Sequence, residues 1–240
     1  MKTSKFLILI SLFLVLTSCL EAQFYRSVRG NGNVVKKERP AGYFDGVKVS
    51  TGIDVYLSQG NKESIIVEAD ENIHEYIVTE IRNGVLHVYF DNVSIRNAEM
   101  KRVYVTMKDI RSLKTSSAGD IAGETPVKCD EIELESSSAG DLRLELYAQN
   151  VKVRISSSGN IRLSGEAVSL DAGLSSAGDL NAYNFTVKDA EVNVSSAGNA
   201  EIFVTRKLEA HSSSAGDIVY GGNPEYVDAR SSSAGNIRRR

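Results

Sequence analysis

The stretch Ser116–Asp120 reads SSAGD, and it decides the fold because it returns six more times before residue 240. The later copies are Ser137–Asp141, Ser156–Asn160 (SSSGN), Ser175–Asp179, Ser195–Asn199, Ser213–Asp217 and Ser232–Asn236. Their glycines, Gly119, Gly140, Gly159, Gly178, Gly198, Gly216 and Gly235, are spaced 18 to 21 residues apart. A repeat of this length is typical of a solenoid, in which each coil contacts only its neighbours.

The residues on both sides of each motif alternate between apolar and polar. Val151, Val153 and Ile155 precede one copy, and Ile161 and Leu163 follow it. A period of two on both sides predicts a strand, a bend and a second strand, and the repeat half shows no period of 3.6 that would indicate helices. We therefore predict an all-β fold, a single-stranded parallel β-helix (β-solenoid) with coils of about 19 residues, and we expect it to be right-handed.

The motif itself is predicted to be the corner of each coil. Its glycine suits a positive φ or a close approach of two backbone segments. Counting the alternation through the motif places the second serine, such as Ser117, inward. The next residue is Ala in six copies and Ser158 in one, and this small size predicts tight packing against the coils on either side. The residue after the glycine is Asp or Asn, which we expect to point outward and to stack into a ladder where interleaved Asn relieves repulsion. The ladder residues are Asp120, Asp141, Asn160, Asp179, Asn199, Asp217 and Asn236.

Three interpretations of this ladder stay open: structural, a weak Ca²⁺ or ligand site, and catalytic. Ca²⁺ takes six to eight oxygen ligands, some of which Asp, Asn and Ser could supply. Catalytic carboxylate pairs need unlike environments, whereas these occupy equivalent positions, so we favour the structural interpretation. The chain has no G-x-S-x-G, H-E-x-x-H, C-x-x-C or phosphate-binding motif. We predict no catalytic residues, no metal and no cofactor, and we interpret Cys129 as a small buried hydrophobe.

The first part of the chain lacks the motif but keeps the alternation. Gly52–Leu57, Ser64–Ala69 and Gly84–Phe90 read as strands, and Arg82-Asn83-Gly84 reads as a turn. We predict irregular β coils or a sandwich-like cap over residues 24–110 and regular repeats over residues 111–240. No Pro/Gly/Ser-rich linker separates the two parts, so we expect one continuous domain.

The N-terminus is predicted to be a signal peptide over residues 1–18, with Lys2 and Lys5 before an apolar run that is too short to span a bilayer. Leu16-Thr17-Ser18-Cys19 resembles a bacterial lipobox, which predicts lipidation of Cys19 and a membrane anchor. The alternative is an ordinary signal peptide that is cut after Ala22. We expect an exported lipoprotein of the outer membrane; the alternative is a soluble periplasmic or secreted protein.

The charge balance argues against nucleic acid as a partner. The chain has 28 basic and 31 acidic residues, a net charge of −3, and removing the leader removes two of the basic ones. It has no basic face and no run of aromatic side chains for base stacking.

Further residues carry a resemblance to a known family. They are Asn31-Gly32-Asn33-Val34, Phe44–Val49, Gly52–Val55 and the SSAG[DN] coils. From about Val28 to Asn236 the chain resembles the family "Putative auto-transporter adhesin, head GIN domain". The resemblance implies a parallel β-helix that Bacteroidota export, often as a lipoprotein, and a role in adhesion. It brings no catalytic residues.

Three functions therefore stay open at this point. The first is a non-enzymatic envelope protein, an adhesin that binds a surface ligand, glycan or protein, over an extended face. The second is a carbohydrate-active enzyme related to β-helical lyases or hydrolases, and the third is a purely structural envelope component. A groove with unlike titratable groups would favour the enzyme, and a uniform polar face would favour the binder. The sequence leaves the ligand and the oligomeric state open.

Overall fold

The computed structural model describes residues 26–240, which form strands and one 3₁₀ turn, η1 (Glu71–Ile73). The predicted leader (1–18) and Cys19 lie outside the described residues. The first strands are β1 (Arg26–Arg29), β2 (Val34–Arg39), β3 (Gly46–Val49), β4 (Asp54–Gln59), β5 (Ser64–Asp70), β6 (Ile77–Arg82), β7 (Val85–Phe90), β8 (Val93–Arg96) and β9 (Lys101–Met107). The repeat strands are β10 (Ser112–Thr115), β11 (Asp120–Gly123), β12 (Val127–Ser136), β13 (Asp141–Ile155), β14 (Asn160–Leu174), β15 (Asp179–Val194), β16 (Asn199–Ser212), β17 (Asp217–Gly221), β18 (Tyr226–Ser231) and β19 (Asn236–Arg239).

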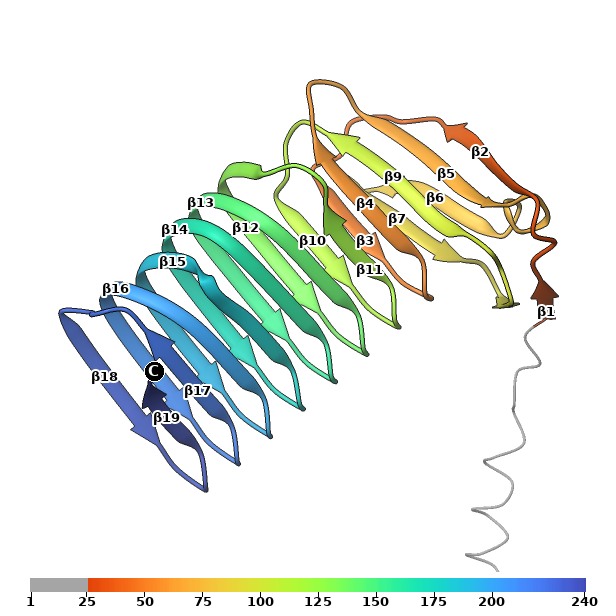
Figure 1. Cartoon of the computed structure of the whole chain (residues 1–240). Helices are drawn as coiled ribbons and strands as arrows, with labels where there is room; N and C mark the ends of the chain where they lie inside the picture. The colour runs from red at the N-terminus through yellow and green to blue at the C-terminus, as the bar shows by residue number, and fades with distance from the viewer. Residues whose placement is uncertain (1–25) are drawn as a thin grey trace, which may run out of the picture.

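Each full coil, or rung, is one long strand that bends midway and ends in a tight turn. β13 pairs with β14 in parallel along its whole length, and β16 pairs with β17 through its first half and with β18 through its second. Every rung thus contributes to two faces: the post-turn face follows the motif and the pre-turn face precedes it. In Figure 1 the tight turns follow the lower edge and the wide bends the upper edge. The predicted parallel β-solenoid is confirmed; its handedness stays a prediction.

The core lies between the two faces and follows the alternation in the sequence. Leu144 on the post-turn face and Val153 on the pre-turn face are buried, whereas their neighbours Arg143 and Lys152 are exposed. One cluster of buried apolar side chains extends from Phe44 to Ile218. Burial of apolar area, at about 25 cal/mol per Å², is the main force that holds such stacked coils together.

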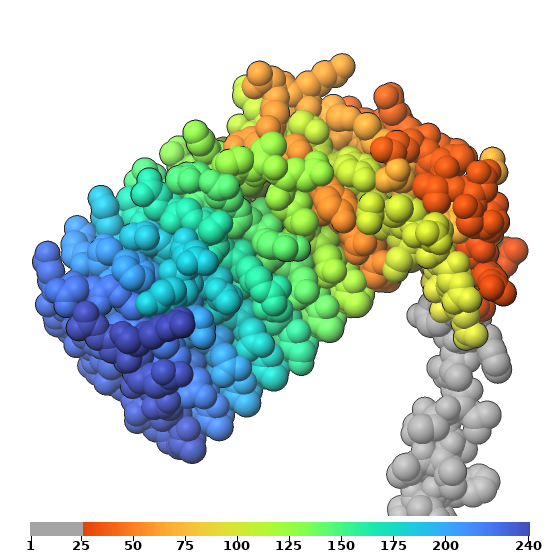
Figure 2. All heavy atoms as spheres, in the orientation of Figure 1, coloured from red at the N-terminus to blue at the C-terminus, as the bar shows by residue number. Residues whose placement is uncertain are grey.

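Residues 26–110 form a cap that continues the stack of the rod (111–240) and then closes it. β3 pairs in parallel with β10 and β4 with β11, so the stack begins before the first SSAGD. β7 and β9 extend it by one more layer. Beyond them the pairing becomes antiparallel, through β5 and β2 on one face and β6 on the other. Cap and rod share a continuous surface (Figure 2).

A buried carboxylate organises the outer end of the cap. Asp70 is fully buried, and its two oxygens accept backbone N–H bonds from Gly32 (2.8 Å), Glu99 (3.0 Å) and Met100 (3.0 Å). These bonds tie the Gly30–Asn33 loop to the end of β5. The Asn-Gly-Asn stretch therefore has a structural role, and its partner Asp70 was not singled out by the sequence.

Candidate functional site

The seven copies of the motif form seven equivalent tight turns. In each, the second serine has φ of 49° to 52° and the next residue, Ala or Ser158, has φ of 57° to 64°. The N–H of the glycine donates to the carbonyl of the first serine at 2.8 to 3.1 Å. Two central residues with positive φ and this closing bond describe a type I′ turn. For residues other than glycine this backbone region costs about 1–2 kcal/mol each.

This geometry decides between the two alternatives for the glycine and corrects two predictions. The positive φ lies at the second serine and the alanine, and none of the corner glycines has it, so the close approach of two backbone segments remains as the reason for the glycine. Ser117 and Ala118 are exposed while Gly119 is buried, so the inward serine and the packed alanine are wrong. The two consecutive left-handed residues form a turn that points away from the core, so the alternation is interrupted at Ser117 and resumes in the same phase at Gly119 and Ile121.

The corner glycine is needed because the backbone of the preceding rung lies against it. A Cβ at Gly178 would stand 2.7 Å from Ile155 Cγ2 and 3.1 Å from the Ile155 carbonyl carbon. At Gly159 it would stand 2.5 Å from the carbonyl carbon of Ser136. Since real Cβ atoms do not approach backbone this closely, any side chain at these corners would push two rungs apart.

The Asp/Asn residues stack directly upon one another on the post-turn face. Successive pairs in register run from Asp120–Asp141 to Asp217–Asn236. Asn199 Nδ2 donates to Asp179 Oδ1 at 2.7 Å, which shows how interleaved Asn relieves repulsion. Asp54 of the cap extends the ladder beyond Asp120, although it belongs to no copy of the motif.

Nothing in the ladder indicates a metal or an acid–base pair. Burial raises the pKa of Asp120, and the charges of Asp141 and Asp54 add to it, while the backbone N–H of Asp141 opposes the shift. Among residues 26–240, no three His, Cys, Asp or Glu side chains are placed to hold a metal ion. The Ca²⁺ alternative therefore has no geometric support, and we do not propose it. Burial raises the pKa of Cys129 to about 11, so this thiol is not a nucleophile at neutral pH.

A groove follows the pre-turn face along the turns, and we call it the turn groove. It holds about 780 Å³ and is lined by the first serine of each motif, by the residue two positions earlier and, between them, by the inward-facing row Thr115, Ser136, Ile155, Leu174, Val194, Ser212 and Ser231. The serines are Ser116, Ser137, Ser156, Ser175, Ser195, Ser213 and Ser232. The second row, two positions earlier and in register from strand to strand, is Lys48, Lys114, Glu135, Arg154, Gly173, Asn193, His211 and Arg230.

This second row was missed because its letters do not repeat. Each member stands five residues before the corner position, so only alignment on that position would have found it. Gly173 leaves a gap in the row, over which Arg154 reaches to Asp171 at 2.7 Å.

Three of the four basic side chains of the groove row, Lys114, Arg154 and Arg230, are held in ion pairs. Lys114 Nζ lies 2.8 Å from Glu135 and 3.2 Å from Glu133, and Arg230 lies 2.7 Å from Asp228. Burial alone would lower the pKa of Lys114, but the hydrogen bonds to these two carboxylates outweigh it and raise the pKa. The hydrogen bond from Lys114 likewise lowers the pKa of Glu133. All these shifts favour the charged forms.

A second hollow, of about 1500 Å³, lies along the bends. Its lining changes type from rung to rung, as in the register Lys128, Tyr147, Glu166, Thr186. Gln59 of the cap closes one end by bonding to the carbonyl and the N–H of Lys128 at 2.9 and 2.8 Å. Because no contact repeats along it, this hollow offers no extended surface of one kind.

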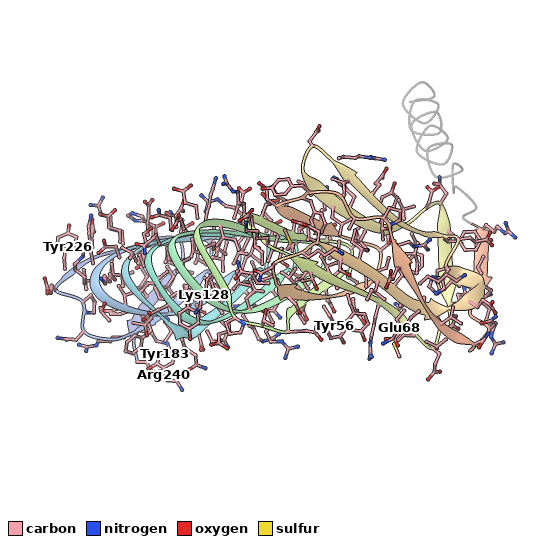
Figure 3. The ribbon with its side chains drawn as sticks, turned by 90° about the horizontal axis from the view of Figure 1, so that it is seen from above. Tyr56, Glu68, Lys128, Tyr183, Tyr226 and Arg240 are labelled. Carbon is pink, nitrogen blue, oxygen red and sulfur yellow. The ribbon has the colours of Figure 1, made fainter. Side chains whose placement is uncertain are left out.

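In two aromatic clusters on the outer side of the post-turn face, the ring faces already contact other side chains of the protein. Tyr56 and Tyr104 stack with centroids 5.4 Å apart, and Arg102 and Lys36 cover them at 5.5 and 5.2 Å. Nearer the C-terminus, Tyr183 meets the edge of Phe203 at 5.8 Å and Arg240 lies 4.7 Å from the Tyr183 centroid. Figure 3 shows Tyr56, Tyr183 and Arg240 along the same side. These clusters join neighbouring strands and leave little ring surface for a ligand.

Comparison with known proteins identifies the class. The family "Putative auto-transporter adhesin, head GIN domain" matches residues 43–224, and the chain belongs to this family. No curated protein matches. Membership in an adhesin-like family points to an exported surface protein. Within residues 26–240, no helix is long and apolar enough to cross a membrane.

Solved structures share the fold. A putative adhesin from Bacteroides fragilis has a TM-score of 0.79 at 18% identity, covering 89% of this chain and 100% of its own. A putative lipid binding protein from Parabacteroides distasonis has a TM-score of 0.74 at 23% identity, over 90% and 100%. A putative adhesin from Parabacteroides merdae has a TM-score of 0.72 at 22% identity, over 90% and 99%.

Proposed function

We propose that the protein is a non-enzymatic β-solenoid of the cell envelope that binds a surface ligand in the turn groove. The observation that carries the proposal is repetition: each rung from Ser116 to Ser232 presents one serine hydroxyl at the same place in this groove. The row is built on sheet rather than on loops, so its spacing is fixed by strand pairing, and a ligand can make the same contact many times. Membership in an adhesin family supports binding as the role.

The enzymatic alternative is less well supported by the groove. A general acid or base needs a pKa moved toward the working pH. Here the raised pKa of Lys114 and the lowered pKa of Glu133 move away from neutrality because the two groups pair with each other. Lipid binding, the function in the name of the Parabacteroides distasonis neighbour, would need an apolar pocket. The turn groove is open and rich in hydroxyl and charged groups, so we do not propose it.

We further propose that Cys19 anchors the protein to the outer membrane. The support is the Leu16–Cys19 lipobox-like stretch after a short apolar run. Mass spectrometry of the mature protein from its host should find an acylated N-terminal Cys19. An unmodified N-terminus at Gln23 would contradict the anchor and leave the binding proposal untouched.

A blocking substitution tests the binding proposal. Gly173→Gln puts a side chain into the middle of the groove, where a Cβ would meet only the flexible Arg154 side chain, at 3.3 Å from its Cδ. Ser164→Gln makes a similar change on the other face and is the matched control. On an array of immobilised glycans, mucin and matrix proteins, wild type and Ser164→Gln should bind alike, and Gly173→Gln should bind at least about tenfold more weakly.

Two results would contradict the proposal. One is equal binding of Gly173→Gln and wild type to every array member. The other is loss of binding by both variants alike. Because both sites are on the surface, the free energy of unfolding of both variants should stay within about 0.5 kcal/mol of the wild-type value. This measurement checks that neither variant has misfolded.

A further inference from the structure

We infer that the ligand of the turn groove is a linear, uncharged, hydroxyl-rich chain, a neutral polysaccharide, that lies along the solenoid axis. This inference rests on the proposed function, and it names the chemical class and the orientation of the ligand. Four features of the groove carry it: its shape, its free hydroxyl groups, its charge balance and its lack of exposed apolar side chains.

The shape of the groove fits an extended chain. The serines from Ser116 to Ser232 stand on seven successive rungs, and six steps of about 4.8 Å give a channel of ~29 Å. A volume of about 780 Å³ spread over this length makes a long, shallow channel. Sites for small molecules enclose similar volumes in compact clefts instead. A compact ligand would therefore leave most of this channel empty.

The serine hydroxyls are free to bind. Among residues 26–240, only one serine of the row, Ser195, uses its hydroxyl in a bond within the protein, a 3.4 Å contact to the Leu174 carbonyl. A hydroxyl both donates and accepts, so each can exchange a bound water for a hydroxyl of a ligand at little cost. Asn193 adds an amide that also donates and accepts. A chain that presents hydroxyls at intervals along its length matches such a row.

The charges around the groove cancel, which favours an uncharged chain. The groove row contains four basic residues and one acidic one. The outward row beside it contains five acidic residues and one basic one: Glu133, Lys152, Asp171, Glu191, Glu209 and Asp228. A polyanion would gain from the first row and be repelled by the second. Their ion pairs still present donors and acceptors to neutral hydroxyls.

The groove exposes little of its apolar side chains: Ile155, Leu174 and Val194 belong to its lining but are at most 3% exposed. The exposed large hydrophobic residues of the described chain are Tyr43, Tyr147, Tyr226 and Val227, and none of them lines the turn groove. Protein partners and acyl chains depend on buried aromatic or aliphatic contacts. Because the apolar side chains of the lining point into the core, the groove surface favours a polar chain over both.

Binding of defined oligosaccharides tests the inference. Calorimetry on the mature protein would compare β-1,4-linked glucose and N-acetylglucosamine oligomers, from disaccharide to octasaccharide, with oligogalacturonates of the same lengths. At least one neutral series should bind, with Kd falling about tenfold or more from the shortest to the longest member. Its Kd should change little between low and high salt, because no charges are neutralised. Gly173→Gln should abolish the gain with length, and Ser164→Gln should keep it.

The possible failures are distinct. Tighter binding of the oligogalacturonates, weakening with salt, would overturn the neutral ligand and still place binding in the groove. Binding that does not depend on length, or no binding of any of these oligosaccharides, would overturn the extended glycan. In that last case, an array protein whose capture is sensitive to Gly173→Gln would leave the proposed function standing.

Discussion

The cap and the rod build the same corner with different residues. In the rod, every corner has serine and then alanine or serine at positive φ, followed by a glycine that is buried at all corners but the last, Gly235. In the cap, Ser50–Asp54 makes the corresponding turn with Thr51 (φ 61°) and Gly52 (φ 70°) at positive φ, and buried Ile53 takes the place of the corner glycine. The residue that must be glycine in one region is a large aliphatic residue in the other.

The difference comes from what lies against each corner. In the rod, a turn of the preceding rung sits on the glycine and leaves no space for a Cβ. In the cap, the preceding chain leaves the stack after Phe90 and enters β8, which pairs with β1. Ile53 fills the space left free. The near-identity of the seven motifs is therefore imposed by stacking on a like neighbour and not by the turn itself.

Stacking also explains how the rod tolerates its strained residues. Isolated type I′ turns favour Asn-Gly, which accept positive φ at low cost. In the first six motifs of the rod, the residue before the corner glycine donates its N–H to the carbonyl of the second serine of the next turn, as Ala139 does to Ser157 at 3.1 Å. These bonds fix the turn from both sides, so a strained backbone is held by its neighbours.

Substitution of the corner residues should give the largest effects. Ile53→Gly removes a buried side chain and should lower the free energy of unfolding by about 3–5 kcal/mol. Gly178→Val forces branched carbons into the Ile155 backbone and should cost a similar amount, ~3 kcal/mol or more. Denaturant unfolding followed by circular dichroism measures both. Gly173→Val, at an outward position, is the control and should change little. If either corner variant unfolded at the wild-type denaturant midpoint, the neighbouring chain would not determine which residue the corner accepts.

Loss of Asp70 should weaken the cap more than the rod. Asp70→Ala leaves three partly buried N–H groups without their acceptor, at a cost of about 2–3 kcal/mol. Amide hydrogen exchange should then speed up over residues 26–110, while β13 to β16 keep their protection. Equal acceleration throughout would mean that the two regions unfold as one unit, and no acceleration would mean that Asp70 does not hold the Gly30–Asn33 loop.

A smaller effect should depend on pH. The Tyr104 hydroxyl, at 2.8 Å, and the Lys36 amine hold the pKa of Glu68 below its usual value, although burial opposes the shift. A carboxyl with a lowered folded-state pKa stabilises the fold above its ordinary pKa of about 4.3, and this stability is lost as pH falls through the folded-state value. Tyr104→Phe should cost about 1 kcal/mol at neutral pH and less in acid. An effect that is constant with pH would exclude this linkage.

The sequence predicted the stacking and not the interior of the turn. The register of Asp120, Asp141 and Asn160 follows from their common place in the repeated motif, because parallel pairing copies one rung onto the next. The inward placement of Ser117 failed because alternation holds only while the chain is extended. The turn groove could not be found from a repeated letter, since the members of its second row, from Lys114 to Arg230, share a position and no chemistry.

The account is tested most directly by the unfolding midpoints of Ala139→Gly and Gly140→Ala, measured side by side. Ala139 has φ of 60°, and a Cβ at Gly140 would lie 2.9 Å from Thr115 Cβ and 3.0 Å from its carbonyl carbon. We predict that Ala139→Gly leaves stability unchanged or raises it by up to about 1 kcal/mol, because strain is relieved. Gly140→Ala should lower it by about 2 kcal/mol. Tolerance of Gly140→Ala together with destabilisation by Ala139→Gly would contradict the account.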